Sequence, residues 1–176
     1  MKPFSDYLGH CQRLTAEEFQ ARFPWAFFVH SSVTGRPLKP PRAQRMATID
    51  RLVIEEALRQ ITPESRERPV VYGVYEARPR DGAPAQRLTV GCDEGCDIVI
   101  DDASVSRVHA HLSKTGNRYA ILDNDSTAGT QINEQPVAGG HAGALGAGDR
   151  VTFGNVTLEF FEAAGFFAFV RKWLGK

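Results

Sequence analysis

Ser106 and His109 stand close together in the chain and carry the side chains of a possible nucleophile and its general base. A serine beside a histidine would begin a hydrolase triad, with Asp101 or Asp102 as the third member. The chain has no Gly-x-Ser-x-Gly turn to expose such a serine and no Gly-x-x-x-x-Gly-Lys phosphate loop. We therefore expect that the protein is not an enzyme.

Two pairs of side chains have spacings that a metal or redox site could use. Cys92 and Cys96 are four residues apart, and His109 and His111 would share one face of a strand. Neither pair has further ligands clustered around it in the sequence. The three cysteines form no disulfide framework, which fits a reducing compartment. We expect no metal, no cofactor and a cytoplasmic location.

Composition and charge narrow the class of protein. Lysine and arginine total 21, as do aspartate and glutamate, so the formal net charge is zero. A nucleic-acid binder normally has a basic excess, so we expect no nucleic-acid partner. No apolar stretch approaches the roughly 20 residues that cross a bilayer, and the first residues show no secretory signal pattern. Hydrophobic residues make up 42% of the chain, enough for a globular fold.

The first 66 residues predict an extension with helices and one short strand. Thr15 and Glu18 form a capping-box pattern, which predicts a helix over residues 16–22. The apolar run at 26–30 predicts a strand. Apolar side chains spaced three and four apart predict another helix over 49–61.

Short β segments separated by turn residues follow a charged linker at 63–69. Many short strands at close spacing are typical of an antiparallel β-sandwich. The expected strands are 70–77, 88–90, 98–100, 110–113, 119–122, 130–132, 150–153 and 157–161. The expected turns include 80–82, 93–95, 115–117, 134–136 and 154–155.

The end of the chain predicts a helix over 163–174, with Phe166, Val170 and Trp173 on one face. This helix either packs on the sandwich or binds a partner or a membrane surface, because further phenylalanines make it apolar nearly all round. The expected division is an N-terminal extension (1–66), a β-sandwich domain (67–162) and a C-terminal helix (163–176).

A series of motifs with a fixed order and spacing runs through the β-rich part. They are Leu88–Cys92, Cys96–Asp102, Val105–Ala110, Leu122–Thr130, Ile132–Asn133, Leu145 and Gly148–Asp149. Each is weak alone, but together, over about ninety residues, they resemble the forkhead-associated (FHA) domain. The resemblance implies a mainly β, FHA-type antiparallel sandwich whose loops at one end bind other proteins, usually at a phosphothreonine.

The resemblance also implies that Ser106, Arg107 and Thr127 hold the phosphate of the bound protein. A phosphate offers three strong acceptor oxygens and nearly two negative charges. Two hydroxyl donors and a guanidinium fork, brought together from separate loops, suit such a group.

Five neighbouring positions complete the implied site. His109 resembles the structural histidine of the family, and Gly91 and Gly129 resemble its backbone glycines. At two other positions the family usually has arginine and asparagine, but this chain has Cys92 and Ala128. Losing one charge-assisted hydrogen bond, worth roughly 1.5–3 kcal/mol, weakens binding on the order of tenfold to a hundredfold.

We therefore expect a non-catalytic interaction module that binds threonine-phosphorylated proteins in Ser/Thr-kinase signalling. The alternative is a degenerate FHA domain that binds a protein, or assembles, without phosphate. The residues at 92 and 128 favour this alternative. The sequence predicts no oligomeric state.

Overall fold

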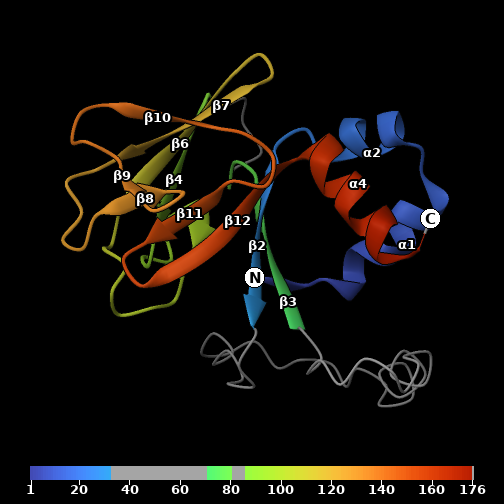
Figure 1. Cartoon of the computed structure of the whole chain (residues 1–176), viewed down its shortest axis with the longest axis horizontal. Helices are drawn as coiled ribbons and strands as arrows, with labels where there is room; N and C mark the ends of the chain where they lie inside the picture. The colour runs from blue at the N-terminus through green and yellow to red at the C-terminus, as the bar shows by residue number, and fades with distance from the viewer. Residues whose placement is uncertain (33–70, 81–85, 176) are drawn as a thin grey trace. The chain divides into compact units, whose positions relative to one another are not determined.

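The computed structural model describes residues 1–32, 71–80 and 86–175, which form two β-sheets and three helices (Figure 1). One sheet has seven strands in the order β1-β3-β2-β12-β11-β8-β9, and the other has five in the order β10-β7-β6-β4-β5. The strands are β1 Lys2–Pro3, β2 Ala26–Ser32, β3 Val71–Ala77, β4 Arg87–Gly91, β5 Ile98–Val99, β6 Ala110–Thr115, β7 Arg118–Asp123, β8 Thr130–Ile132, β9 Gln135–Pro136, β10 Ala142–Leu145, β11 Arg150–Phe153 and β12 Val156–Glu162.

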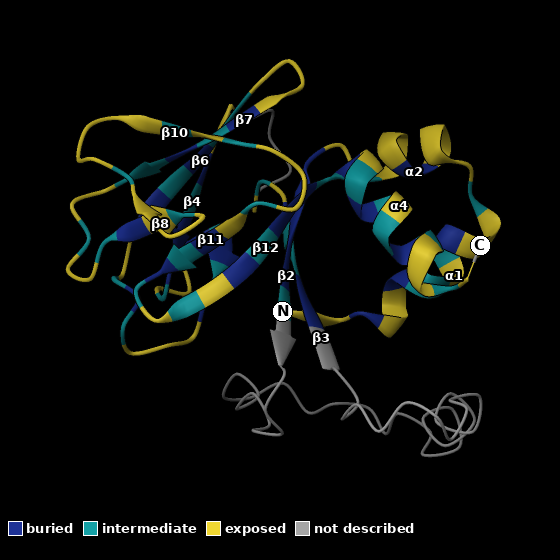
Figure 2. Ribbon diagram, viewed as in Figure 1, coloured by how far each residue is buried: buried dark blue, intermediate teal, exposed yellow. Residues whose placement is uncertain are grey.

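Alternating burial along the strands explains why the two sheets face each other. In β6, for example, Ala110 and Leu112 are fully buried, whereas the residues between and after them are only partly so (Figure 2). The buried residues of both sheets form one core, to which Val90, Ile121, Phe153 and others contribute. The predicted antiparallel β-sandwich is confirmed, and β4 and β5 are the one parallel pair among the strand pairs whose register is described.

Strand β2 lies inside the seven-stranded sheet, between β3 and β12. It pairs antiparallel with β12, and Phe28 stands opposite Phe160. The predicted strand at 26–30 is therefore confirmed, and it belongs to the same sheet as the strands of the FHA-like segment. Successive side chains of β2 enter different cores: Phe28 faces the sandwich core, and Phe27 faces a second core beneath the helices.

The second core fills the space between three helices and the outer face of the seven-stranded sheet. Phe166 of α4 stacks on Phe27 with ring centroids 4.1 Å apart, and Tyr7 of α1 and Phe19 of α2 complete a cluster of aromatic rings. The helices are α1 Ser5–Arg13, α2 Ala16–Arg22 and α4 Ala163–Trp173. Helix α4 thus packs against the sheet and the other helices, as the first of its two interpretations predicted.

The capping box at the start of α2 forms as the sequence predicts. The Thr15 hydroxyl accepts a hydrogen bond from the Glu18 backbone N–H at 3.3 Å, and the Glu18 carboxylate accepts one from the Thr15 N–H at 2.7 Å. Both bonds satisfy backbone donors that a helix start otherwise leaves free, which fixes where α2 begins.

Four elements of the fold were not predicted: α1, β1, β9 and β10. The prediction of a turn at 134–136 was wrong in its position. Asn133 and Glu134 make the turn, with φ of 50° and 69°, and the next two residues form β9. The predicted helix at 49–61 and the linker at 63–69 lie outside the described residues.

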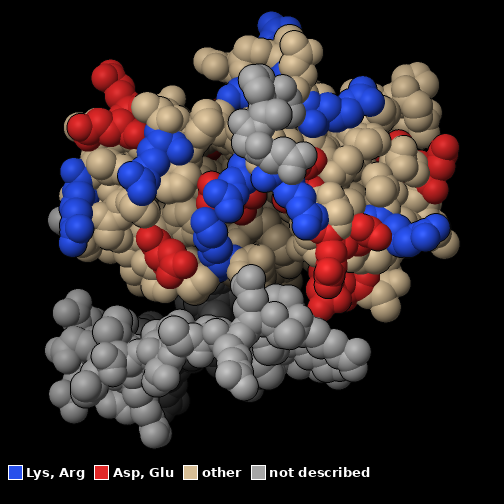
Figure 3. Space-filling view, turned by 180° about the vertical axis from the view of Figure 1, so that it is seen from behind, with Lys and Arg blue, Asp and Glu red and all other residues tan. Residues whose placement is uncertain are grey.

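Two properties of the whole molecule concern its partners. No helix among the described residues is long and apolar enough to cross a membrane. On the face drawn in Figure 3, positive and negative side chains are interspersed, in keeping with the zero net charge of the chain.

Candidate functional site

The strand register brings three loops to one end of the five-stranded sheet. Val90, near the end of β4, stands opposite Ala110 at the start of β6, and Ala110 stands opposite Asp123 at the end of β7. The loops that follow β4, precede β6 and follow β7 must therefore lie side by side. They carry seven of the eight residues that the sequence assigned to the site, and the eighth, Gly91, is the last residue of β4.

Gly91 allows the first two loops to touch through their backbones. The N–H of Cys92 donates to the carbonyl of Ser106 at 3.0 Å, and the N–H of Asp93 donates to the carbonyl of Arg107 at 3.2 Å. A Cβ added to Gly91 would lie 2.0 Å from the Arg107 carbonyl oxygen. Only glycine leaves room for this approach.

His109 joins the second loop to the third. Its side chain is fully buried, its Nδ1 accepts a hydrogen bond from the Ser106 backbone N–H at 3.0 Å, and its Nε2 lies 3.1 Å from the carbonyl oxygen of Gly129. Because Nδ1 accepts, the proton is on Nε2 and is donated to Gly129. Both ring nitrogens are thus used by the backbone, which leaves neither for a metal ion nor for the Ser106 hydroxyl.

A network around Asp123 holds the third loop, and the sequence analysis assigned no role to it. Asp123 accepts hydrogen bonds from the Ser126 N–H at 3.0 Å and from the hydroxyls of Ser126 and Thr130 at 2.6 Å each. The Ser126 hydroxyl in turn accepts from the Gly129 N–H at 3.0 Å. Burial alone would raise the pKa of Asp123, but the hydrogen bonds outweigh it and lower the pKa. The Asp-x-x-Ser spacing, typical of a side-chain-capped turn, is the signal that could have indicated this network.

The proposed phosphate-holding residues meet at the rim of these loops. The Ser106 hydroxyl accepts a hydrogen bond from the Thr127 backbone N–H at 3.1 Å and keeps its own proton to donate elsewhere. The side chains of Arg107 and Thr127 are exposed, and neither forms a hydrogen bond within the described part of the chain. Two hydroxyls and a guanidinium are therefore available at one rim to bind an anion.

Negative charge surrounds this rim. Exposed carboxylates occur in all three loops, namely Asp93, Glu94, Asp101, Asp102 and Asp125. Arg107 is the one arginine or lysine in the loops, which leaves the rim negative overall. An anion would be held by directed hydrogen bonds more than by a positive surface potential.

The cysteines of the first loop fit a packing role. Cys96 is buried, its thiol donates a hydrogen bond to the Arg107 carbonyl at 3.2 Å, and burial raises its pKa. A protonated, buried thiol is unreactive. Cys92 is half-buried beside the sandwich core. No group of three or more potential metal ligands exists among the described residues.

Comparison with known proteins identifies the class. Residues 88–154 match the family model of the FHA domain. The resemblance to the FHA domain that the motifs indicated is therefore confirmed for this part of the chain.

The chain is similar to oxoglutarate dehydrogenase inhibitor of Corynebacterium jeikeium, with 34% identity over 68 residues that make up 39% of this chain and 45% of that protein. It is similar to glycogen accumulation regulator GarA of Mycobacterium tuberculosis, with 38% identity over 64 residues, 36% of this chain and 38% of GarA. The chain thus spans less than half the length of these relatives. Among solved structures, the N-terminal FHA domain of Rad53p from S. cerevisiae in complex with a phosphothreonine peptide is similar at 18% identity, with a TM-score of 0.45, over 81% of this chain and 98% of that one.

Proposed function

We propose that the chain is a non-catalytic, cytoplasmic interaction module that binds proteins phosphorylated on threonine by Ser/Thr kinases. The observation that carries the proposal is the 3.1 Å hydrogen bond from Thr127 to the Ser106 hydroxyl, beside the exposed Arg107. It holds donors from two loops at one point on a rigid sandwich, where a phosphate could accept from both hydroxyls and from the guanidinium. Gly91, His109 and Gly129 would support these loops.

A second function, binding of a partner without phosphate, is favoured by the absence of the family's arginine and asparagine from the rim. Cys92 and Ala128 supply neither the charge nor the amide usual in the family, and five exposed carboxylates surround Arg107. These features favour a partner that binds without phosphate. They also favour basic residues beside the phosphothreonine, since a lysine or arginine there would offset the carboxylates.

Binding of a degenerate peptide library to the full chain tests both functions. The library is offered in three versions, with phosphothreonine, phosphoserine or unmodified threonine at the fixed position. We expect retention of the phosphothreonine pool, enriched in basic flanking residues. Equal retention of the unmodified pool would support the phosphate-independent function, and retention of none by folded protein would reject peptide binding at this rim.

Two matched variants locate the binding. Arg107→Gln removes the guanidinium from the rim and should weaken phosphopeptide binding on the order of tenfold or more. Arg118→Gln removes an equally exposed arginine from the β6–β7 hairpin, at the opposite end of these strands, and should leave binding unchanged. Equal effects of both changes would mean that the loss is one of overall charge and not of a contact.

A further inference from the structure

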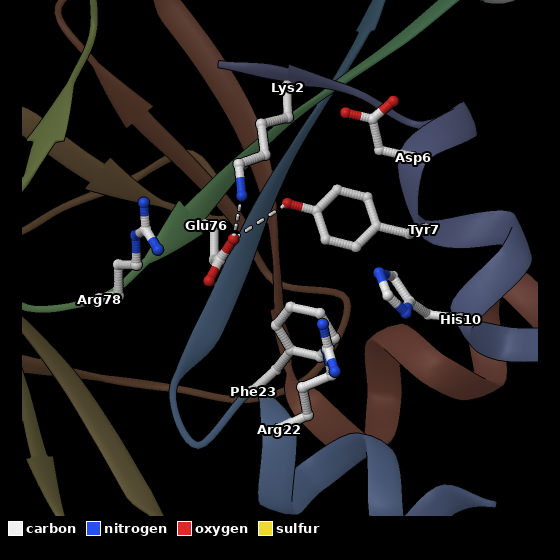
Figure 4. A pocket seen from close by; sticks show the side chains of 8 residues that line it. All are labelled: Lys2, Asp6, Tyr7, His10, Arg22, Phe23, Glu76 and Arg78. Atoms are coloured by element: carbon white, nitrogen blue, oxygen red, sulfur yellow. Dashed lines mark hydrogen bonds and ion pairs between the residues drawn. The ribbon is translucent and has the colours of Figure 1, made fainter. Parts of the chain in front are cut away.

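A cavity of about 440 Å³ lies between the N-terminal helices and the edge of the seven-stranded sheet (Figure 4). Its walls come from β1, α1, the end of α2 and the end of β3. None of its lining residues belongs to the three loops of the FHA site. The volume falls within the range of about 300–1,000 Å³ usual for small-molecule sites.

Basic side chains from four separate elements line this cavity. They are Lys2 of β1, His10 of α1, Arg22 at the end of α2 and Arg78 just after β3. Figure 4 shows them spread around the cavity, which places donors on several sides of anything inside. Within the described part of the chain, the side chains of His10, Arg22 and Arg78 form no hydrogen bond or ion pair.

The partly buried carboxylate at the cavity, Glu76, already has a positive partner. Glu76 accepts a hydrogen bond from Lys2 at 2.7 Å and one from the Tyr7 hydroxyl at 3.4 Å, both at the same oxygen. Burial, and then the charge of Glu76, raise the pKa of Tyr7, so its hydroxyl stays protonated. Lys2 therefore offsets Glu76, and Asp6 is the other carboxylate in the lining.

Aromatic contacts help to orient the free donors. The Arg22 guanidinium carbon lies 6.0 Å from the centre of the Phe23 ring, and the His10 ring meets the same ring edge-on at 5.6 Å. Phe23 is half-buried, so part of its surface can contact an organic group in the cavity. A guanidinium held over an aromatic ring loses little further freedom when it binds.

The remaining charge favours an anion. Three lining side chains are positive and two, Asp6 and Glu76, are negative, so the cavity is positive overall even with histidine neutral. Asp6 lies at the end of the cavity near Lys2 in Figure 4, and Arg22 lies at the other end. The two guanidinium groups, which pair with no acid among the described residues, each present a fork that matches the oxygens of a phosphate.

We propose that this cavity is a second binding site, for a phosphate monoester. Arg22 and Arg78 would bind the phosphate, His10 would add a donor, and the ring of Phe23 would contact the esterified group. A monoester fits better than a carboxylate because it carries nearly two negative charges and three oxygens for two guanidinium forks. It fits better than free phosphate because the cavity has room for an organic group.

Calorimetric titration of the full chain with phenyl phosphate tests the proposal, with benzoate and inorganic phosphate as comparisons. We expect phenyl phosphate to bind more tightly than either. The double variant Arg22→Gln, Arg78→Gln should weaken its binding at least about tenfold. Arg107→Gln and Arg118→Gln should leave it unchanged, which separates this cavity from the FHA site.

Two results would overturn the proposal. One is benzoate binding as tightly as phenyl phosphate, and the other is loss of binding in Arg107→Gln but not in the double variant. If the double variant fails to fold, amide chemical shifts of the unaltered chain, measured by NMR, test the proposal instead. Phenyl phosphate should shift the signals of His10 and Phe23 more than those of Ser106 and Thr127. The reverse order would reject the cavity as the site.

Two more probes show which class of natural molecule would supply the phosphate monoester. AMP represents nucleotides, and O-phosphothreonine represents phosphorylated proteins. Both contain the chemistry that the cavity would recognise, so tighter binding of either, if it is lost in the Arg22→Gln, Arg78→Gln variant, supports the site and identifies its source. Failure of both, together with failure of phenyl phosphate, would contradict it, and the FHA proposal would be untouched by that outcome.

Discussion

Gly91 is the residue whose replacement should disturb the candidate site most directly. In Gly91→Ala the new Cβ would meet the Arg107 carbonyl, a backbone atom that cannot turn aside. We expect a loss of unfolding free energy of about 3 kcal/mol and weaker binding at the rim. Urea denaturation measures the first effect and peptide titration the second.

Gly9→Ala is the matched control for this prediction. Gly9 lies within α1, and an added Cβ would meet nothing within 4 Å. Alanine should therefore stabilise the protein by about 0.5–1 kcal/mol. If the two substitutions change the unfolding free energy in opposite directions, the close approach at Gly91, and not the loss of a glycine as such, causes the loss of stability. If Gly91→Ala leaves the unfolding free energy unchanged, the contact is disproved.

Restoring the family residues should strengthen phosphopeptide binding. In the double variant Cys92→Arg, Ala128→Asn the rim gains a guanidinium and an amide, and the added charge offsets part of the surrounding negative charge. We expect at least about a tenfold gain in affinity for a phosphothreonine peptide, measured by fluorescence anisotropy. An unchanged affinity would mean that the rim does not contact the peptide as proposed.

The Asp97 carboxylate should make stability depend on pH. It accepts hydrogen bonds from the N–H and hydroxyl of Thr89, both at 2.8 Å, and from the Arg80 N–H at 2.9 Å. Burial raises its pKa, but these bonds outweigh burial and lower the pKa below the usual value. The stability that Asp97 contributes is therefore complete at neutral pH and is lost as the pH falls from about 4 through the lower pKa of the folded state.

Urea denaturation at pH 7 and at about pH 3 checks this expectation. Asp97→Asn should be less stable than the unaltered chain at neutral pH and should lose less further stability in acid. Parallel acid losses in both proteins would show that other carboxylates, such as Asp123, carry the effect.

At the residue scale, the assignment of the site residues stays a prediction. The structure adds the contacts of two of them: His109 bonds the backbones of two loops, and Gly91 lies against the Arg107 carbonyl. The motif order assigned no role to Asp123 or Ser126, because the chain turn that lets Ser126 bond both Asp123 and Gly129 exists only in the folded loop.

Helix α4 is the element whose packing joins the two ends of the chain. Phe166 is fully buried against Phe27 of β2, whereas Trp173 on the last turn is 52% exposed. Phe166→Ala should lower the unfolding free energy by about 3–5 kcal/mol, and Trp173→Ala should have a much smaller effect. Thermal unfolding of both variants checks this, and equal losses would contradict the burial difference.

The helices and strands differ in how well they can be predicted from their sequences. Helix α2 was predicted to the residue because its capping box is a local signal. Helix α1 was missed because its N-cap residue, Phe4, makes no side-chain capping bond, and because Gly9 within it lowers the helix propensity of the segment. Strand β10 was missed because Ala142–Leu145 has no β-branched or aromatic residue, and its pairing with β7 is what makes it a strand.

At the scale of the whole molecule, β2 affects where the sandwich can be cut. The division at residues 67 and 162 stays a prediction, but β2 lies outside it and inside the sheet. A fragment 67–162 would lack β2, which would leave β3 and β12 with unpaired backbone groups. We expect this fragment to be much less stable than the full chain or to aggregate, as size-exclusion chromatography and circular dichroism would reveal. A monomeric, cooperatively unfolding fragment would support the predicted boundaries instead.

The place of β2 also has a consequence for synthesis on the ribosome. Its partner β12 and the helix that covers it, α4, follow all the other described strands in the chain and are therefore made after them. Until β12 and α4 have been made, no strand or helix covers Phe27 and Phe28 on that side. Their apolar side chains therefore stay accessible. We expect the pairing of β2 with β12 to form late, after all the strands between them in the sequence have been made.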